Sequence, residues 1–359
     1  MSFKLKRILF IPLGGLGGDA GELSRQRLIK KLCRQFASTA AEKELLAKSL
    51  RECYRLLYFD SDEREPTVIP SDFAGLPLET ISAPINYQRI KSYSGKEIIS
   101  RLDEKPNAYL KDYVKAREAF IAAKDADSEA ESVRGFGELN GLLSIGLIQK
   151  QIVEELGSLK SFEKTEAYQN LLKFGLARQG AELGMEIFIV GSTAGGQATG
   201  LFLLVLALLG LALRDYPVRP KIRLHLALPG FHAEKAEKLR QAEYFKTLAV
   251  LRDLAKIKRG DTVMRLPHPN GRMSIETYSI PLSSVNLYKP SDGSNPQKYA
   301  AFISQFAETL VASHLTAFAA DLRRDKSNAV ANARRMSEEP ENPYRPTTDS
   351  GVESVAESV

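Results

Sequence analysis

Four apolar runs along the chain have the pattern of strands that are buried on both faces. They are residues 6–13, 54–62, 185–192 and 221–231, and each is rich in aliphatic or aromatic side chains. The second run ends in acidic residues at 60–62. Continuous apolar runs of this length are typical of parallel sheets, in which helices cover both faces.

Between these runs, apolar residues recur at the spacing of amphipathic helices. The first helix is expected to begin at Leu23, with Leu28, Ile29, Leu32 and Phe36 on one face. Further helices are predicted at residues 40–53, 138–156, 164–179, 201–214, 233–257 and 296–324, the last with Asn295 as its cap and Pro296 at its first position. Alternating strands and helices predict an α/β fold, a mainly parallel sheet with helices on both faces.

The remaining segments are read as connections. A short strand is expected at residues 78–85 within a proline-rich stretch, and an exposed loop at 121–133. Two strand-like runs around the turn "HPNG" (268–271) predict a hairpin within residues 262–290. The chain loses periodicity near residue 326, so we expect one domain over 1–325 and a disordered tail over 326–359.

The most apolar segment, Leu201–Leu213, is too short for a membrane span, which needs about 20 apolar residues. Extending it backwards would place Gln197 and Thr199 in hydrocarbon. An all-round apolar helix of this length is better explained as a helix buried against a sheet. We therefore expect no membrane span.

Composition narrows the function classes. The net charge is +6, but the basic residues alternate with acidic ones, which is typical of solvated helix faces, so direct nucleic-acid binding is not expected. The two cysteines and four histidines show no metal-ligand spacing, so no protein metal site is expected. Two cysteines without a pattern fit a reducing compartment, and we expect a cytoplasmic protein.

Two glycine-rich segments carry the candidate chemistry. "GGLGGDAGE" (14–22) and "STAGGQATG" (192–200) each follow a predicted strand and precede a predicted helix. Glycine lets backbone N–H groups approach phosphate, and a helix N-terminus favours negative charge. No GxxxxGK[ST] P-loop occurs. "GLGGDA" (15–20) satisfies the dinucleotide fingerprint, so a Rossmann-type dinucleotide enzyme stays an alternative, although the acidic residues come roughly 40 positions later rather than about 20.

In their order, these motifs resemble the tubulin/FtsZ superfamily, most closely its divergent bacterial tubulin-like branch, over roughly residues 5–320. "FIPLGGLGGDAGE" resembles the first nucleotide loop, which implies phosphate contacts by Gly15, Gly17 and Gly18, with Asp19 where FtsZ has asparagine. "LLYFDSD" resembles the second loop. This implies that Asp60 and Asp62 help to hold phosphate-bound Mg²⁺, directly or through water.

Three further segments extend the resemblance. "SVRGFGELNGLL" is similar to an R-x-x-G-R segment of the bacterial branch, with Glu138 in place of its second arginine. "STAGGQATG" stands at the position of the GGGTG[ST]G signature, with Gln197 and Ala198 as departures. "ALPGFHAEKAEKLRQAEYFKTL" resembles the sugar-contacting loop and the helix whose ring stacks on guanine. The implied site residues are Arg134, Ala194, Gly195, Gly196, Gln197, Thr199, Gly200 and Tyr244, with Phe245 as the alternative ring.

The resemblance implies GTP or GDP as ligand, with Mg²⁺ held mainly by the phosphates, and a GTP-dependent switch or assembly subunit that self-associates or binds a partner protein. Residues 296–324 resemble the family's central helix, but no N-x-D-x-x-[DE] catalytic loop follows and the usual C-terminal domain is not expected. No catalytic residue is assigned, and the chain is at most a weak or partner-activated GTPase. The alternative is a degenerate, nucleotide-free homologue that serves as a scaffold or partner-binding protein, which Gln197 and Ala198 favour.

Overall fold

The computed structural model describes residues 5–61, 86–91, 93, 95–115, 134–177, 179, 183–216, 219–230, 237–260, 262–290 and 296–315. The central sheet has six strands in the order β3-β2-β1-β4-β5-β8, and every neighbouring pair is parallel. The strands are β1 (Lys6–Leu13), β2 (Tyr54–Asp60), β3 (Asn86–Arg89), β4 (Gly184–Ser192), β5 (Lys221–Ala227) and β8 (Leu282–Tyr288). The predicted parallel sheet is confirmed.

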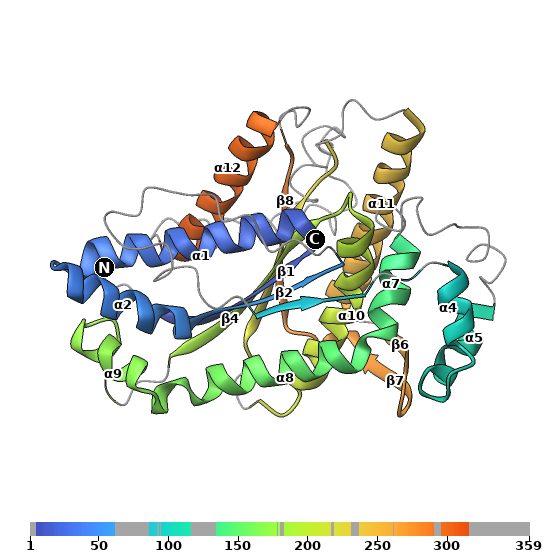
Figure 1. Cartoon of the computed structure of the whole chain (residues 1–359), viewed down its shortest axis with the longest axis horizontal. Helices are drawn as coiled ribbons and strands as arrows, with labels where there is room; N and C mark the ends of the chain where they lie inside the picture. Colours follow the sequence, from blue (N-terminus) through green and yellow to red (C-terminus); the bar gives the residue numbers. More distant parts are fainter. Residues whose placement is uncertain are drawn as a thin grey trace, which may run out of the picture.

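Helices cover both faces of this sheet, as predicted (Figure 1). One face is covered by α1 (Gly14–Phe36), α2 (Ala40–Cys53), α9 (Glu166–Lys173) and α12 (Pro296–Leu315). The other is covered by α7 (Arg134–Leu143), α8 (Ile145–Ser161), α10 (Gly196–Ala212) and α11 (Glu237–Arg259). Apolar residues of α4 (Gly95–Arg101), the 3₁₀ helix η1 (Lys105–Leu110) and α5 (Lys111–Lys115) join the core of this second face.

The predicted hairpin is also present. Strands β6 (Val263–His268) and β7 (Gly271–Glu276) pair antiparallel as a separate two-stranded sheet. A short 3₁₀ helix, η4 (Thr277–Ser279), then redirects the chain, and β8 joins the main sheet parallel to β5.

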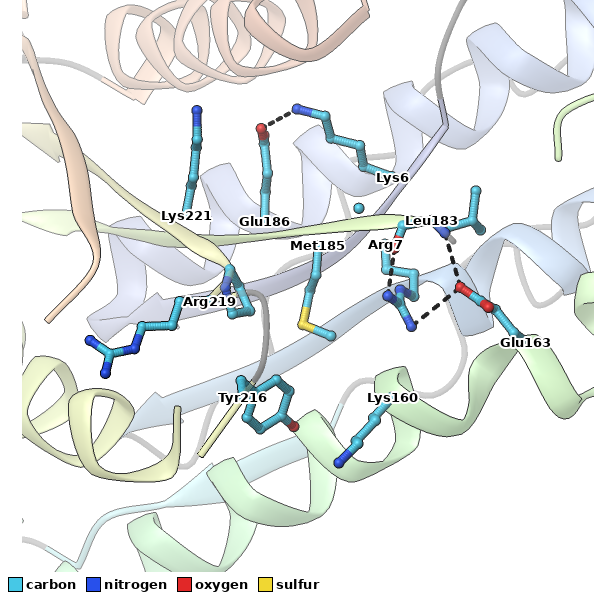
Figure 2. Close-up of a pocket in the computed structure, with 12 residues that line it drawn as sticks. Lys6, Arg7, Lys160, Glu163, Leu183, Met185, Glu186, Tyr216, Arg219 and Lys221 are labelled. Carbon is cyan, nitrogen blue, oxygen red and sulfur yellow. Dashed lines mark hydrogen bonds and ion pairs between the residues drawn. The ribbon is translucent and has the colours of Figure 1, made fainter. Parts of the chain in front are cut away.

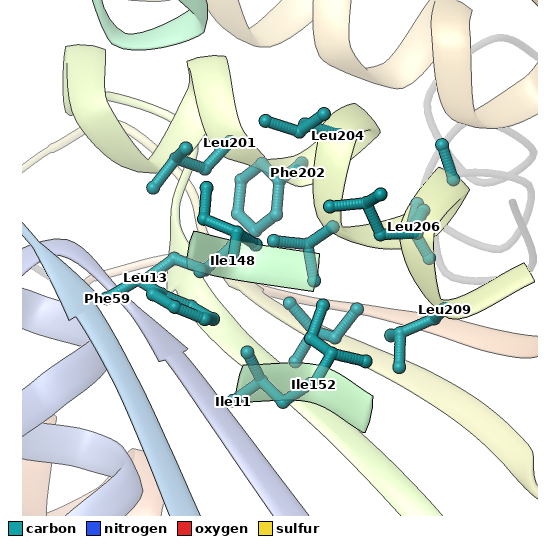
Figure 3. Close-up of a cluster of buried hydrophobic side chains, with 14 of the residues drawn as sticks. Ile11, Leu13, Phe59, Ile148, Ile152, Leu201, Phe202, Leu204, Leu206 and Leu209 are labelled. Atoms are coloured by element: carbon teal, nitrogen blue, oxygen red, sulfur yellow. The ribbon is translucent and has the colours of Figure 1, made fainter. Parts of the chain in front are cut away.

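The core of the second face explains why α10 is apolar all round. Leu201, Phe202 and Leu209 of α10 belong to one buried cluster with Ile11 of the sheet and Ile148 of α8 (Figure 3). Because the sheet lies on one side of α10 and other helices lie against it elsewhere, almost no face of this helix meets water. The predicted buried helix is confirmed, and within the described residues no helix is long and apolar enough to cross a membrane.

The start of α1 differs from the prediction. The helix begins at Gly14, directly after β1, rather than at Leu23. A Cβ atom on Gly17 would lie 2.4 Å from the carbonyl oxygen of Val190. On Gly18 it would lie 2.6 Å from Cζ of Tyr58. Glycine therefore allows the first turns of α1 to pack closely on β4 and β2, and this tertiary contact outweighs the low helix propensity of glycine.

Other boundaries were also wrong by several residues. The helix predicted at 138–156 is two helices, α7 and α8, which meet at Ser144. The helix predicted at 164–179 is preceded by the 3₁₀ helix η3 (Phe162–Lys164) and shortens to α9, and α10 begins at Gly196 instead of residue 201. The predicted strand at 78–85, the loop at 121–133 and the tail at 326–359 lie outside the described residues.

Candidate functional site

The candidate site lies at the carboxyl ends of β1, β2 and β4, which are adjacent in the sheet. From β1, the next strands in sequence, β2 and β3, are added on one side of the sheet. The strands that follow, β4, β5 and β8, are added on the other side of β1. Ligands of open α/β sheets bind at such a switch point, beyond the carboxyl ends of the strands. Both glycine segments and Asp60 lie at this edge, because they directly follow or end these three strands.

The structure brings these segments into contact. Gly14 has a φ of +70°, and a Cβ atom on it would lie 3.5 Å from Cβ of Ala198. A Cβ atom on Gly15 would lie 4.0 Å from Oδ2 of Asp60. The first turns of α1 and α10 are therefore neighbours, with the end of β2 beside them.

Both helices begin without a side-chain cap. Leu13 precedes α1 and Gly195 precedes α10, and neither makes a side-chain capping hydrogen bond. Neither helix has an acidic residue in its first turn. By contrast, α2 begins with a complete capping box formed by Thr39 and Glu42. The first N–H groups of α1 and α10 therefore keep their capacity to bind an anion, and both helix dipoles favour one there.

Gln197 adds a side-chain donor to this region. It is 8% exposed, and its Nε2 atom has no hydrogen-bond partner among the described residues. Leaving a buried amide N–H₂ unpaired costs about 1–3 kcal/mol. A ligand that accepts a hydrogen bond from Nε2 would remove this cost.

Most other residues of the second glycine segment are buried in contacts within the protein. Oγ1 of Thr199 donates to the carbonyl oxygens of Gly195 and Gly196, at 2.6 and 3.0 Å, and the residue is fully buried. Ala198 is 3% exposed and belongs to the apolar core, and Gly200 is buried. Gly195 is exposed, and a Cβ atom on it would meet nothing within 4 Å. Open space is thus found at Gly195.

Asp60 is held rigidly at the end of β2. Its Oδ2 accepts a hydrogen bond of 2.5 Å from the hydroxyl of Tyr58, and its Oδ1 accepts one of 2.7 Å from the backbone N–H of Ser61. Burial and the charge of Asp60 together raise the pKa of Tyr58 well above its ordinary value, so the phenol stays a donor. Asp62 lies outside the described residues.

Asp19 has a partner that the sequence did not suggest. The hydroxyl of Tyr299, in the first turns of α12, donates to Oδ2 of Asp19 at 2.9 Å. Burial, followed by the charge of Asp19, raises the pKa of Tyr299. The sequence showed Tyr299 only as an aromatic residue near the start of a predicted helix, on the apolar face of that helix. It gave no sign of a contact with Asp19.

The loop between β4 and α10 is held by contacts with β5 and α11. The backbone N–H of Thr193 donates to the carbonyl oxygen of Ala227 at 2.9 Å, and Oγ1 of Thr247 donates to Oγ1 of Thr193 at 2.9 Å. The ammonium group of Lys246 donates to the carbonyl oxygen of Ala194. Tyr244 lies on α11 but is 58% exposed, and the adjacent Phe245 is 69% exposed, so both rings face solvent.

Helix α7 meets α10 near its start. A Cβ atom on Gly137 would lie 2.4 Å from the carbonyl oxygen of Gly196, so the two helices approach within backbone contact. Arg134 is the first residue of α7, and its side chain lies outside the described structure.

A separate cavity of about 400 Å³ lies at the opposite, amino ends of β1, β4 and β5 (Figure 2). In its lining, Glu186 accepts hydrogen bonds from Lys6 and, at 3.0 Å, from Arg223. Nη1 of Arg7 donates to the carbonyl oxygen of Leu159 at 2.9 Å. This cavity contains none of the residues predicted for the site.

The solved structures to which this chain is similar include three proteins. TubZ of Clostridium botulinum phage c-st is 13% identical with a TM-score of 0.33, and the match covers 87% of this chain and 62% of that one. CetZ2 from Haloferax volcanii, as a GTPγS-bound protofilament, is 14% identical with a TM-score of 0.34, and the match covers 86% and 59%. TubZ of Bacillus thuringiensis serovar israelensis, as a GTPγS-form protofilament, is 13% identical with a TM-score of 0.39, and the match covers 88% and 57%.

The chain thus spans 57–62% of the length of these three structures. No match was found among curated proteins. A family model described as "Tubulin like" matches residues 9–355, which is nearly the whole sequence. The chain therefore belongs to the tubulin-like family.

Proposed function

We propose that the edge formed by β1, β2 and β4 binds the phosphates of a guanine nucleotide, and that the protein acts as a GTP-dependent switch or assembly subunit. The observation that carries the proposal is the contact between two uncapped helix N-termini, those of α1 and α10. The positive ends of both helix dipoles lie side by side, and neither N-terminus has a side-chain cap, which suits the concentrated negative charge of a polyphosphate.

Particular residues have distinct parts in this proposal. The backbone N–H groups around Gly15 and Gly195 would contact phosphate oxygens, because these two glycines are the exposed ones at the two helix starts. Nε2 of Gln197 would donate to the same group. Asp60 would lie near a phosphate-bound Mg²⁺, held in place by Tyr58 and Ser61. Guanine as the base, and self-association, are inferred from family membership.

Hydrolysis is proposed to be weak or partner-activated. No described residue of the site is assigned to position an attacking water, and Asp60 and Asp19 are each engaged by a tyrosine hydroxyl. A nucleotide-free scaffold remains the second candidate. Gln197, Ala198 and the missing catalytic loop supported it. The methyl group of Ala198 is buried close to Gly14 at the start of α1, and so does not project into open space.

The test uses Gly195→Leu. Position 195 is exposed, and a Cβ atom there meets no other atom within 4 Å, so the leucine side chain should not disturb folding. It should instead occupy the proposed phosphate position. The matched control is Gly157→Leu on α8, where a Cβ atom likewise meets nothing within 4 Å. Binding of GTP and GDP with Mg²⁺ is measured by calorimetry, together with nucleotide released from the purified protein on denaturation.

We expect the wild type and Gly157→Leu to bind equally, and Gly195→Leu to bind at least about tenfold more weakly at an unchanged melting temperature, because a lost charge-assisted contact is worth that much. Unchanged affinity in Gly195→Leu would refute the assignment of this edge. A wild type that neither contains nor takes up nucleotide would favour the scaffold.

A further inference from the structure

A second charged cavity lies at the amino end of β2, away from the candidate nucleotide site. Its volume is about 750 Å³, and α1, α2, β2, β3 and α8 contribute to its lining. Arg55 and Leu56, near the start of β2, line the cavity together with Asn86, the first residue of β3. Arg55 and Asp60 are five positions apart on β2, which separates the two sites by roughly 16 Å along the strand.

The most buried charged residue that lines this cavity is Arg25 of α1. It is 1% exposed, and its Nε and Nη2 atoms have no hydrogen-bond partner among the described residues. Nε lies 3.2 Å from Oε2 of Glu22 as an ion pair, but the pair is not a hydrogen bond. Burial raises the pKa of Glu22, although the charge of Arg25 and the hydrogen bond from Gln26 act in the opposite direction.

A second buried arginine, Arg7, differs in that both of its Nη atoms donate to backbone acceptors. Arg7 is 4% exposed, and its guanidinium donates to the carbonyl oxygen of Leu159. It also donates to the carbonyl oxygen of Leu183 and lies 3.6 Å from Oε1 of Glu163 (Figure 2). Within the part of the chain that the structure describes, Nε and Nη2 of Arg25 find no such acceptors. A buried charge without acceptors is costly, so the arrangement at Arg25 calls for an acceptor from outside these residues.

Other cations surround Arg25. Arg51 of α2 lines the same cavity, and burial and then the charge of Arg25 lower its pKa. Lys48 and Arg55 also line the cavity. The acidic residues of the lining are Glu52 and Glu155, and Glu155 is already paired with Arg55. Among the residues that line the cavity, basic side chains therefore outnumber acidic ones.

We propose that this cavity binds a small phosphate-bearing anion, with phosphate oxygens accepting from Nε and Nη2 of Arg25 and with Arg51 beside them. The planar guanidinium fork matches the geometry of phosphate oxygens, and its charge-assisted hydrogen bonds are about twice as strong as neutral ones. The site is independent of the nucleotide site, since it shares none of the residues proposed there.

The experiment measures binding of inorganic pyrophosphate by calorimetry at constant ionic strength. The variants are Arg25→Gln, Arg51→Gln and Gly195→Leu. Arg34→Gln is the control, because Arg34 is exposed at the end of α1 and its substitution removes the same charge outside the cavity. Arg51→Gln carries the test if Arg25→Gln does not fold, since Arg51 is only half-buried.

We expect pyrophosphate affinity to fall at least about tenfold in Arg25→Gln and Arg51→Gln, and to persist in Arg34→Gln and in Gly195→Leu. GTP binding should be unchanged in Arg51→Gln. Affinity that survives in Arg51→Gln, or that is lost only in Gly195→Leu, would place pyrophosphate in the nucleotide site and overturn the proposal. Absence of pyrophosphate binding in the wild type would overturn it as well.

Discussion

The hydroxyl of Tyr299 donates a hydrogen bond of 2.9 Å to Oδ2 of Asp19, although the two residues are 280 positions apart in the sequence. Further along the same two helices, Arg27 donates to Oγ of Ser304 at 2.6 Å, and Lys31 pairs with Glu308. Helix α12 is therefore joined to α1 along its length, and the contact nearest the candidate site is the one between Tyr299 and Asp19.

Replacing Tyr299 by phenylalanine tests this contact. The ring stays buried, but the carboxylate of Asp19 loses a donor, and a hydrogen bond to a charged group is worth about 1.5–3 kcal/mol. We expect the free energy of unfolding in urea to fall by that amount. In a double-mutant cycle with Asp19→Asn the two losses should not add, and strictly additive losses would show that the two side chains do not interact.

The glycines of α1 should divide into two classes. Gly17→Ala would bring a methyl group against the backbone of Val190, so we expect a loss of about 1–3 kcal/mol from overpacking. Gly15→Ala would meet Asp60 only at 4.0 Å, so its stability should stay unchanged or rise by about 0.5–1 kcal/mol. Urea unfolding of the two variants decides this, and equal losses would mean that α1 does not pack on β4 as described.

Because of Glu186, the free energy of unfolding should decrease as the pH falls into the acidic range. Burial alone would raise the pKa of Glu186, but Arg223, Lys6 and His314 lower it overall to below its ordinary value of 4.5. Because the folded pKa lies below the unfolded one, the stabilisation is complete above the unfolded pKa and is lost as the pH falls through the folded pKa.

We therefore expect Glu186→Gln to lose about 3 kcal/mol near pH 7, because two cations lose their buried partner, and the difference from wild type should shrink below about pH 4. Urea midpoints at a series of pH values measure this difference. Glu154→Gln is the control, since Glu154 pairs with Lys150 on an exposed helix face and should change little. A difference from wild type that does not vary with pH would contradict the proposed role of Glu186.

Both cysteines should be unreactive in the native protein. Cys33 and Cys53 are buried with free thiols, and burial raises the pKa of Cys33 to about 12 and that of Cys53 above its ordinary value. Thiolate is the reactive form, so a disulfide reagent at pH 8 should react with neither until the protein unfolds. Rapid reaction of one thiol per native chain would show that one of the two sites is open.

The sequence placed three residues of the candidate site at strand ends by local pattern alone. Gly15, Asp60 and Gly195 were placed after three strands, and the structure puts all three at one edge of the sheet. The sequence did not show that Gly15 is exposed whereas Gly17 is packed against β4. Glycine is needed at position 17 because of the carbonyl oxygen of Val190, which is far away in the sequence. The sequence also did not find Tyr299 beside Asp19, since a helix face shows that a ring is buried but not against what.

Local pattern determined the α/β class, the main strands and the buried helix α10, because an apolar run or an all-round apolar helix is stable only between covering layers. Tertiary structure decided where α1 begins, which glycines face solvent, and which buried charges find partners. These features depend on atoms that the fold brings together from distant positions, as Arg7 and Arg25 show. The two arginines look alike in the sequence, yet the guanidinium of Arg7 donates to two carbonyl oxygens, whereas Nε and Nη2 of Arg25 have no hydrogen-bond partner among the described residues.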